Sequence, residues 1–468
     1  MSEKYQITIV GGGPGGYLAA LRAASLGLKT AIIEKEALGG VCLNHGCIPT
    51  KVLTHGTSLY RRIYSAEEFG FDLKEINFSF AGLQNKKKEV VKELTDHVEE
   101  LLKKGNVDIY SGEANLLSPD RVKVDLTDGE AVELSTENVI LATGSEEFYP
   151  PIPGLDLPGV ITSWEALALE ELPKSLAVIG GGVIALEMAS IFSGLGTEVT
   201  IVHRSERLLR RMDLEMVRRL STYLRKSGLQ VKMNTPVERI EQTEKGLKIT
   251  ATGKKGEEVI EADKVLLSVG RKAAFGGQDL ESLGVDYSDA GIKVNSKMET
   301  TVPGIYAVGD CTAPGYFLAH VAYHQGLVAV ENIAGLEANF DGSVVPGCLF
   351  TDPELACVGM SEEEAKEKGL EKLEVGKFPF SACGKASCQG ETEGVVKIIS
   401  AGEDQKVIGV HILGPHASDL LQEGTLAVDQ GVKAADLANL IHPHPTLSES
   451  VWEAAMAINK APLHFGRR

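Results

Sequence analysis

The chain has 468 residues, of which 43 % are hydrophobic and 24 % charged, a balance typical of a globular protein of about three domains. Its formal net charge of −18 argues against a nucleic-acid partner, because such binders normally carry a basic face. The lysine run from Lys86 to Lys88 precedes acidic residues at helical spacing and is interpreted as a solvated helix face. We expect no membrane span, because no window reaches the roughly 18 apolar residues that a span requires.

A strand pattern begins almost at Met1, so we expect no signal peptide and a cytoplasmic location. Ile7 to Val10 lead into the turn Gly11-Gly12-Gly13-Pro14-Gly15-Gly16, and a helical stretch follows. In such a unit Gly11 permits the tight turn, Gly13 lets the backbone approach a pyrophosphate, and Gly16 leaves room for helix packing. The helix N-terminus then receives the phosphate charge, so the sequence predicts a dinucleotide site.

Two close cysteines, Cys42 and Cys47, follow this unit. The chain has seven cysteines, which in so long a sequence are not a structural framework, and a disulfide in a reducing compartment is more often catalytic. Their neighbours do not form a core pattern, and Lys51 follows Cys47 by four residues. If a helix starts near Cys47, its N-terminus and the Lys51 ammonium lower a thiol pKa from its usual value of about 8.5. The pair offers a two-electron disulfide couple.

A polar helical segment near 85–104 and a strand-rich segment ending at 138–145 come next, and the proline-rich stretch 150–154 reads as a domain boundary. The glycine-rich signal then repeats 169 residues on, so that Gly180, Gly182 and Ala185 correspond to Gly11, Gly13 and Gly16. Two such units in register are strong evidence for two nucleotide-binding folds. A further buried strand is predicted over 301–310, and after about Val345 a separate domain of alternating strands and helices begins.

The two units differ where the second strand ends. Glu34 lies 23 residues beyond Gly11, where a carboxylate accepts ribose hydroxyls and repels a 2′-phosphate. The same spacing from Gly180 falls on His203, and four arginines follow it: Arg204, Arg207, Arg210 and Arg211. The first unit therefore suits an unphosphorylated ribose and the second suits NADPH. The alternative is a solvated arginine cluster that pairs with Glu206 and Asp213.

Near the C-terminus, His442 and His444 are each followed by proline, which predicts a rigid segment rather than a core strand. Glu449 lies five residues beyond His444 and could orient its ring, which would make a general base near neutral pH. Taken alone, His444 favours a structural role over a catalytic one, because no partner is visible in the sequence. A dithiol substrate changes this balance, because it must lose a proton before it attacks a disulfide.

These motifs, from the first glycine turn and the CxxxxC-x-P element to the His-x-His-Pro-Thr-x-x-Glu ending, resemble the dihydrolipoamide dehydrogenases of the flavin-dependent pyridine nucleotide–disulfide oxidoreductase family. The resemblance runs essentially from end to end. It implies an α/β flavoprotein with two Rossmann-like domains and a C-terminal α+β dimerisation domain. The implied bounds are 1–149 and 271–345 for the FAD-binding parts, 150–270 for the NAD(P)-binding domain and 346–468 for dimerisation.

The resemblance also implies roles for single residues. Glu34 would hold the adenosine ribose of FAD, Asp310 the ribityl chain, and Lys51, paired with Glu187, would lie near the reactive flavin nitrogen. Cys47 would contact the flavin and Cys42 would meet the substrate, while His444, oriented by Glu449, would be the base supplied by the other subunit of a homodimer. Further cofactor positions implied are Thr143, Gly144 and Ala319 for FAD, and Val237 and Gly270 for NAD or NADP, with no metal.

The expected function is oxidation of dihydrolipoyl groups, with NADP⁺ or NAD⁺ as the electron acceptor. The dihydrolipoyl group would belong to a lipoyl domain or to the H-protein of a glycine cleavage system, or the substrate would be a small dithiol. Ala185 and His203-Arg204 are closer to the NADPH-using glutathione reductases, and His45 departs from the small apolar residue usual between the cysteines. A glutathione-reductase-like enzyme is the first alternative, although Arg22 is the only basic residue on its helix. A non-catalytic flavoprotein docking subunit is the second. Cys383 and Cys388 receive no role.

Overall fold

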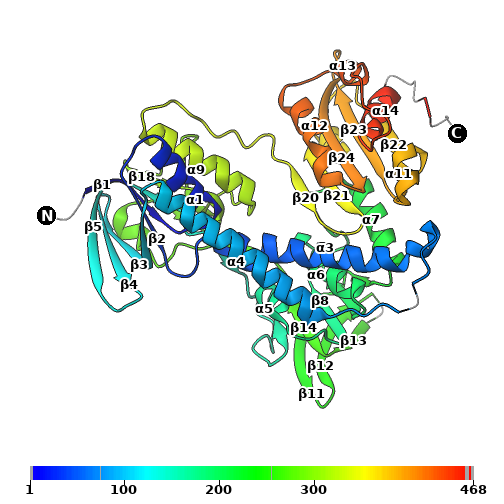
Figure 1. Cartoon of the computed structure of the whole chain (residues 1–468), viewed down its shortest axis with the longest axis horizontal. Helices are drawn as coiled ribbons and strands as arrows, with labels where there is room; N and C mark the ends of the chain where they lie inside the picture. Colours follow the sequence, from blue (N-terminus) through cyan, green and yellow to red (C-terminus); the bar gives the residue numbers. More distant parts are fainter. Residues whose placement is uncertain (1–3, 74, 255, 459–462, 465–468) are drawn as a thin grey trace.

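Three large β-sheets organise the computed structural model, which describes residues 4–73, 75–254, 256–458 and 463–464 (Figure 1). A six-stranded sheet is built mainly from the first third of the chain, a five-stranded sheet from the middle and another five-stranded sheet from the end. Figure 1 shows the C-terminal sheet apart from the other two, with α3 running between them. The predicted class, two nucleotide-binding folds and a C-terminal α+β domain, is confirmed.

The first sheet has a parallel core. β1 pairs in parallel with β2 and β5, β2 pairs with β3, and β5 pairs with β18. β4 joins β3 and β5 in an antiparallel meander. Since parallel strands end at the same edge, the turn after β1 lies beside the ends of its neighbours. The strands are β1 (Lys4–Val10), β2 (Thr30–Glu34), β3 (Asp108–Ser118), β4 (Arg121–Leu126), β5 (Ala131–Leu141) and β18 (Ile305–Ala307).

The second sheet repeats this topology. Its parallel order β10-β9-β8-β14-β7 matches β3-β2-β1-β5-β18, and a three-stranded meander replaces the β3–β5 hairpins. The predicted second strands of the two units are observed with the expected ends, at Glu34 and His203. The strands are β7 (Val160–Ile161), β8 (Ser175–Ile179), β9 (Glu198–His203), β10 (Gln230–Met233), β11 (Val237–Thr243), β12 (Gly246–Gly253), β13 (Gly256–Ala262) and β14 (Lys264–Leu267).

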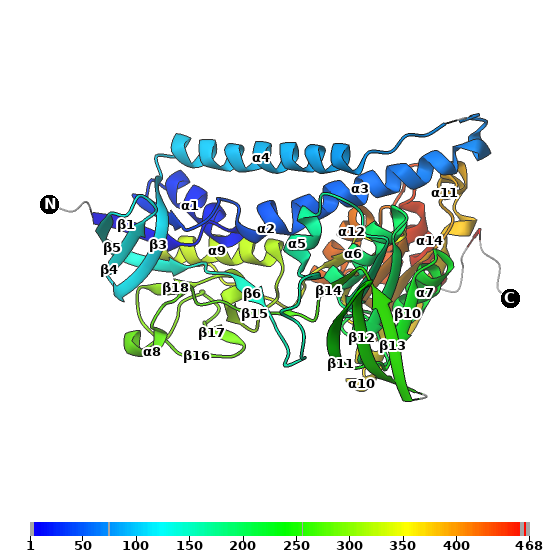
Figure 2. The same ribbon diagram turned by 90° about the horizontal axis from the view of Figure 1, so that it is seen from below.

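Helices cover both parallel sheets, because the apolar strands are buried on two faces. Figure 2 shows the long helices α3 and α4 side by side along one edge of the molecule. The helices of this part are α1 (Pro14–Ser25), α2 (Gly40–His45), α3 (Cys47–Tyr64), α4 (Phe80–Lys104), α5 (Ser163–Ala168), α6 (Val183–Gly194), α7 (Leu214–Lys226), α8 (Leu280–Leu283) and α9 (Ala319–Ile333). Two small sheets complete it: β6 (Ser145–Glu147) with β15 (Arg271–Ala273), and β16 (Tyr287–Ser288) with β17 (Gly291–Lys293) and β19 (Thr312–Ala313).

The third sheet is antiparallel, in the order β20-β21-β24-β23-β22. Its apolar face packs against α12 and α14 around a separate core. The elements are β20 (Gly347–Leu349), β21 (Glu354–Gly359), α10 (Glu362–Glu367), β22 (Glu374–Pro379), α11 (Gly384–Gln389), β23 (Val395–Ala401), β24 (Lys406–Gly414), α12 (Ala417–Asp429), α13 (Ala434–Ala438) and α14 (Glu449–Ile458).

Two local expectations need correction. The strand predicted over 301–310 is only β18, because a turn precedes it and a short 3₁₀ helix, Gly309–Cys311, follows. Lys87 is not on a solvated face: it is buried, and its ammonium donates to the carbonyl oxygen of Leu167. Burial lowers the pKa of Lys87. Among the described residues, no helix is both long and apolar enough to span a bilayer.

Candidate active site

The first glycine turn brings the end of β2 onto the start of α1. Gly11 has a φ of +106°, and a Cβ there would lie 2.3 Å from the carbonyl oxygen of Ala142 in the neighbouring strand end. Gly13 is the N-cap of α1, and Gly16 lies in its first turn. The backbone N–H of Gly12 donates to Glu34 Oε2 at 2.6 Å. The turn thus presents free helix N–H groups for phosphate beside a fixed carboxylate that suits ribose hydroxyls.

The second turn has the same backbone but a different side chain over it. Gly180 has a φ of +144°, Gly182 is the N-cap of α6, and Ala185 lies in the first turn of that helix. A Cβ on Gly181 would lie 2.6 Å from Nδ1 of His203. His203 therefore covers the second turn in the place where Glu34 covers the first.

The arginines after His203 differ, because Arg207 is half-buried and donates to the carbonyl oxygen of Met212. Arg204 and Arg210 are exposed, and within the described residues neither forms an ion pair. Burial lowers the pKa of His203, and the positive charges of Arg204 and Arg210 lower it further, which places both guanidinium groups near the ring. The expected partner Asp213 is instead fully buried and bound to Lys397 Nζ at 2.9 Å. The neutral imidazole and two unpaired cations leave this site positive.

Four predicted flavin-binding residues lie around the ends of β5 and β18. Thr143 Oγ1 donates to the carbonyl oxygen of Ala274 at 2.7 Å, and Gly144 has a φ of +73°. Asp310 accepts from Ser145 Oγ at 2.7 Å, and burial raises the pKa of its carboxyl. Ala319 is the first residue of α9. Of the other two predicted nucleotide residues, Val237 begins β11 and Gly270, with a φ of +134°, follows β14.

The two cysteines lie on successive helices, the short α2 and the long α3. Cys47 begins α3, so the condition on which the sequence argument for a lowered thiol pKa depends is met, whereas the helix that carries Cys42, α2, was not expected. Both side chains are free thiols, and a hydrogen bond between them lowers the pKa of Cys47 and raises that of Cys42. The Lys51 charge also favours the Cys47 thiolate. The reduced pair is therefore asymmetric, because the Cys47 thiol loses its proton more readily than the Cys42 thiol.

Lys51 lies where α3 meets the second nucleotide-binding domain and the C-terminal domain. Its Nζ donates to both carboxylate oxygens of Glu187 on α6, at 2.9 and 2.8 Å, the pairing that the sequence resemblance implies. It also lies 4.0 Å from the ring centroid of Phe350, whose backbone N–H donates to Glu187 Oε1 at 2.9 Å. The pairing neutralises the lysine, and it ties α3 to the other two domains. No sequence pattern pointed to Phe350, because its contacts are all long-range.

His444 is oriented as expected but lies away from the thiols. Its Nδ1 is 2.9 Å from Glu449 Oε1, while Glu449 Oε2 accepts from the backbone N–H of Thr446 at 2.8 Å. The imidazole is 78 % exposed. Among the described residues it has no hydrogen bond or ion pair to Cys42 or Cys47, and Figure 2 shows α14 well separated from α2. Within one chain, this base does not reach the thiol pair.

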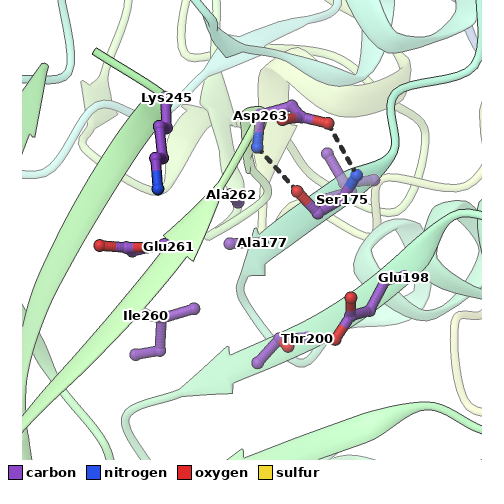
Figure 3. A pocket seen from close by; sticks show the side chains of 10 residues that line it. Ser175, Ala177, Glu198, Thr200, Lys245, Ile260, Glu261, Ala262 and Asp263 are labelled. Atoms are coloured by element: carbon purple, nitrogen blue, oxygen red, sulfur yellow. Dashed lines mark hydrogen bonds between the residues drawn. The ribbon is translucent and has the colours of Figure 1, made fainter. Parts of the chain in front are cut away.

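A cavity of about 260 Å³ lies elsewhere, between β8, β9 and β13 (Figure 3). Asp263 and Ser175 close one side through two hydrogen bonds of 3.0 and 2.9 Å. The cavity opens at the starting ends of β8 and β9, opposite the glycine turn that follows β8. Because nucleotides bind at the carboxyl ends of parallel strands, this cavity is not the nucleotide site.

Comparison with known proteins agrees with this arrangement. The sequence profile of the pyridine nucleotide-disulphide oxidoreductase family matches residues 5–326, and the profile of that family's dimerisation domain matches 345–455. Dihydrolipoyl dehydrogenase of Bacillus subtilis is 41 % identical, covering 99 % of this chain and all of its own. The mitochondrial dihydrolipoyl dehydrogenase of Pisum sativum is 40 % identical, over 99 % of this chain and 93 % of the relative.

Among solved structures, the Cu(II) complex of the HOCl-induced flavoprotein disulfide reductase RclA from Escherichia coli superimposes with a TM-score of 0.87 at 28 % identity, over 97 % of this chain and all of that one. Enzymes of the dihydrolipoyl dehydrogenase type use FAD and NAD(H) or NADP(H), as the two glycine turns suggest. The chain is an oxidoreductase and belongs to the pyridine nucleotide–disulphide oxidoreductase family.

Proposed function

We propose that this protein oxidises dihydrolipoyl groups with NADP⁺ or NAD⁺, as a homodimer whose FAD and Cys42–Cys47 pair relay the electrons. The asymmetric thiol pair beside Lys51 is the observation that supports this most, since the two thiols differ in how readily each loses its proton and so suit different roles. The dihydrolipoyl dehydrogenases that match over almost the whole chain favour this substrate. The partner would be a lipoyl domain or the H-protein of a glycine cleavage system, in the cytoplasm.

The residues of the first turn fit FAD. Gly11, which leaves no room for a Cβ, and the carboxylate of Glu34 suit its pyrophosphate and ribose, and the half-buried Asp310 carboxyl suits a hydroxyl of the ribityl chain. When bound, the flavin supplies the transfer of an electron pair between the thiol pair and the nicotinamide. We assign FAD to residues 1–149 and 271–345, the nicotinamide nucleotide to 150–270 and dimerisation to 346–468.

The protein supplies thiol exchange and proton transfer. His444 of the partner subunit takes a proton from the substrate dithiol, and the resulting thiolate attacks Cys42 Sγ of the oxidised pair, so that Cys47 leaves as a thiolate. The second substrate thiol then attacks the lipoyl sulfur of the mixed disulfide and passes its proton to the departing Cys42 sulfur, which releases cyclic oxidised lipoyl. Cys42 ends as a thiol, in line with its raised pKa, and the first proton remains on His444. The substrate loses two electrons and the thiol pair gains them.

Exposed apolar residues support the dimer. Leu440 and Ile441, just before the histidine segment, are 53 % and 99 % exposed. Apolar side chains so exposed beside a functional segment are typical of a surface that a partner covers. A second copy would cover this surface and could bring His444 to the thiols, which the same chain does not do.

The structure disfavours the two alternatives. A glutathione-like anionic substrate calls for free basic residues near the thiols, but Arg22 is bound to Glu331 Oε1 at 2.7 and 3.2 Å. A non-catalytic docking subunit requires neither an asymmetric thiol pair nor the oriented His444–Glu449 pair.

The proposal is tested by steady-state oxidation of dihydrolipoamide with NAD⁺ and with NADP⁺. We expect turnover with both, and none above background in the Cys42→Ser variant. Cys388→Ser, which removes an exposed thiol of α11, is the matched control and should retain full activity. Turnover of glutathione disulfide in place of dihydrolipoamide would refute the proposal.

A further inference from the structure

Two tyrosines from distant parts of the chain meet at the thiol pair. The hydroxyls of Tyr17 on α1 and Tyr323 on α9 are 3.0 Å apart, and their rings form an edge-to-face contact with centroids 6.1 Å apart. Both side chains are half-buried. Sequence reasoning gave Tyr323 no role, because its partner lies 306 residues away.

Close backbone contacts hold this pair beside Cys42. A Cβ on Gly326 of α9 would lie 2.6 Å from the carbonyl oxygen of Gly15, so the helices of the two tyrosines pack at short distance. The start of α2 rests on the same end of α1, since the backbone N–H of Gly39 donates to the carbonyl oxygen of Gly12 at 2.8 Å. Tyr17 is in the first turn of α1 and Cys42 in the first turn of α2.

The electrostatics agree with this placement. Burial raises the pKa of both tyrosines, and the nearby thiols raise it further, Cys42 more than Cys47. Both phenols are thus uncharged at neutral pH, and both lie within electrostatic reach of Cys42, the thiol proposed to meet the substrate. The nearby cations are already paired, Lys51 with Glu187 and Arg22 with Glu331.

We propose that the hydrogen-bonded Tyr17–Tyr323 pair forms an uncharged aromatic wall beside Cys42, which favours a neutral aliphatic dithiol over an anionic one. The rings offer apolar surface to an alkyl chain. The pair uses only one of its two hydroxyl protons internally, which leaves the other to donate to a sulfur of the substrate or of Cys42. Neither tyrosine carries a positive charge that would offset the negative charge of a substrate carboxylate. This inference extends the proposed dihydrolipoyl oxidation to its substrate selectivity and rests on it.

The first test probes the charge at Cys42 without using the dithiol substrate. The phosphine-reduced protein is alkylated with neutral iodoacetamide or anionic iodoacetate, and the labelling rate of the Cys42 peptide is followed by mass spectrometry. Tyr323→Arg should raise the iodoacetate-to-iodoacetamide rate ratio at least about fivefold, because a guanidinium near the thiol attracts the anion. Tyr323→Glu should lower the ratio. His324→Arg, which puts the same charge on the next, exposed residue of α9, should change it less than about twofold.

The second test compares dihydrolipoamide with the anionic dihydrolipoate. The unmodified enzyme should have the higher kcat/KM for the amide, and Tyr323→Arg should shift the preference toward the acid at least about fivefold. An alkylation ratio unchanged in both Tyr323→Arg and Tyr323→Glu would overturn the wall, even if one variant lost its flavin. If the unmodified protein fails to oxidise dihydrolipoamide but the variants still shift the alkylation ratio, the proposed function is refuted. The aromatic wall beside Cys42 is then still supported.

Discussion

Replacing Arg204 by alanine should raise the Michaelis constant for NADP⁺ about tenfold and leave that for NAD⁺ almost unchanged. A charge-assisted hydrogen bond to phosphate contributes about 1.5–3 kcal/mol. Because Arg204 is exposed, the lower end applies, and about 1.4 kcal/mol corresponds to a factor of ten. NAD⁺ lacks the 2′-phosphate, so its binding does not depend on the Arg204 guanidinium. We therefore expect the unmodified enzyme to use NADP(H) at least as well as NAD(H).

His203→Glu tests the same site from the opposite direction. The His203 ring covers Gly181, as the Glu34 carboxylate approaches Gly12 in the first unit. A carboxylate at 203 should therefore accept the free 2′-hydroxyl, repel the phosphate and turn the preference toward NAD⁺ by about tenfold or more.

The assay is the initial rate of dihydrolipoamide oxidation over a range of each nucleotide. Arg225→Ala is the matched control, since Arg225 is also exposed but lies in the last turn of α7, away from the turn, and should change neither constant. A strong NAD⁺ preference in the unmodified enzyme, or equal effects of Arg204→Ala on both nucleotides, would show that these arginines are only surface charge.

Three further predictions follow from the site and the core. The two-electron-reduced protein should show a long-wavelength absorption band from the Cys47 thiolate beside oxidised flavin, which Cys47→Ser abolishes and Cys42→Ser retains; the reverse result would invalidate the assigned roles. His444→Ala should slow reduction of the enzyme by dihydrolipoamide at least ~10²-fold and leave flavin reduction by NADPH nearly unchanged. Stopped-flow absorbance measures both rates, and equal losses would indicate a folding or dimer defect. Lys397→Met should lower the free energy of unfolding by about 3–5 kcal/mol in denaturant titration, because it leaves the buried Asp213 carboxylate without its cation. Lys366→Met, at an exposed lysine, should change the free energy of unfolding by less than about 1 kcal/mol, and similar losses in both variants would contradict the burial argument.

The same ion cluster makes stability depend on pH in a definite direction. Lys366 and Lys397 lower the pKa of Glu362 from 4.5 to about 2, and the pKa of Asp213 is lowered as well. A carboxyl whose pKa is lower in the folded state stabilises fully above its unfolded value and loses this contribution as pH falls through the folded value. The Glu362 contribution should thus be complete above about pH 4.5 and lost between there and about pH 2. A midpoint of urea unfolding that does not fall over this range would contradict it.

The sequence predicted the features that depend on short-range pattern. Turn geometry and strand periodicity act over a few residues, so local patterns were enough for three features. These are the paired glycine turns, the ends of β2 and β9, and the start of a helix at Cys47. The family resemblance also predicted one long-range contact, the Lys51–Glu187 pair, whose residues are 136 positions apart.

What the sequence missed depends on contacts between distant segments. The burial of Lys87 is invisible in its own helix, because the carbonyl that receives its ammonium belongs to Leu167. Lys397 looks like any lysine in a strand until Asp213 and Glu362 surround it. The Tyr17–Tyr323 contact likewise arises only when α1 packs on α9.

Helix α3 joins the reacting sulfur to the far side of the molecule. It begins at Cys47 and spans 18 residues, about 27 Å at 1.5 Å per residue. Near its other end Arg61 lies 3.6 Å from Asp352, and Arg62 pairs with Glu391, both in the C-terminal domain. One unbroken helix therefore carries Cys47 at its first residue and contacts the C-terminal domain near its last turn, so a shift of that domain against the rest of the chain would be expected to change the position of the Cys47 sulfur.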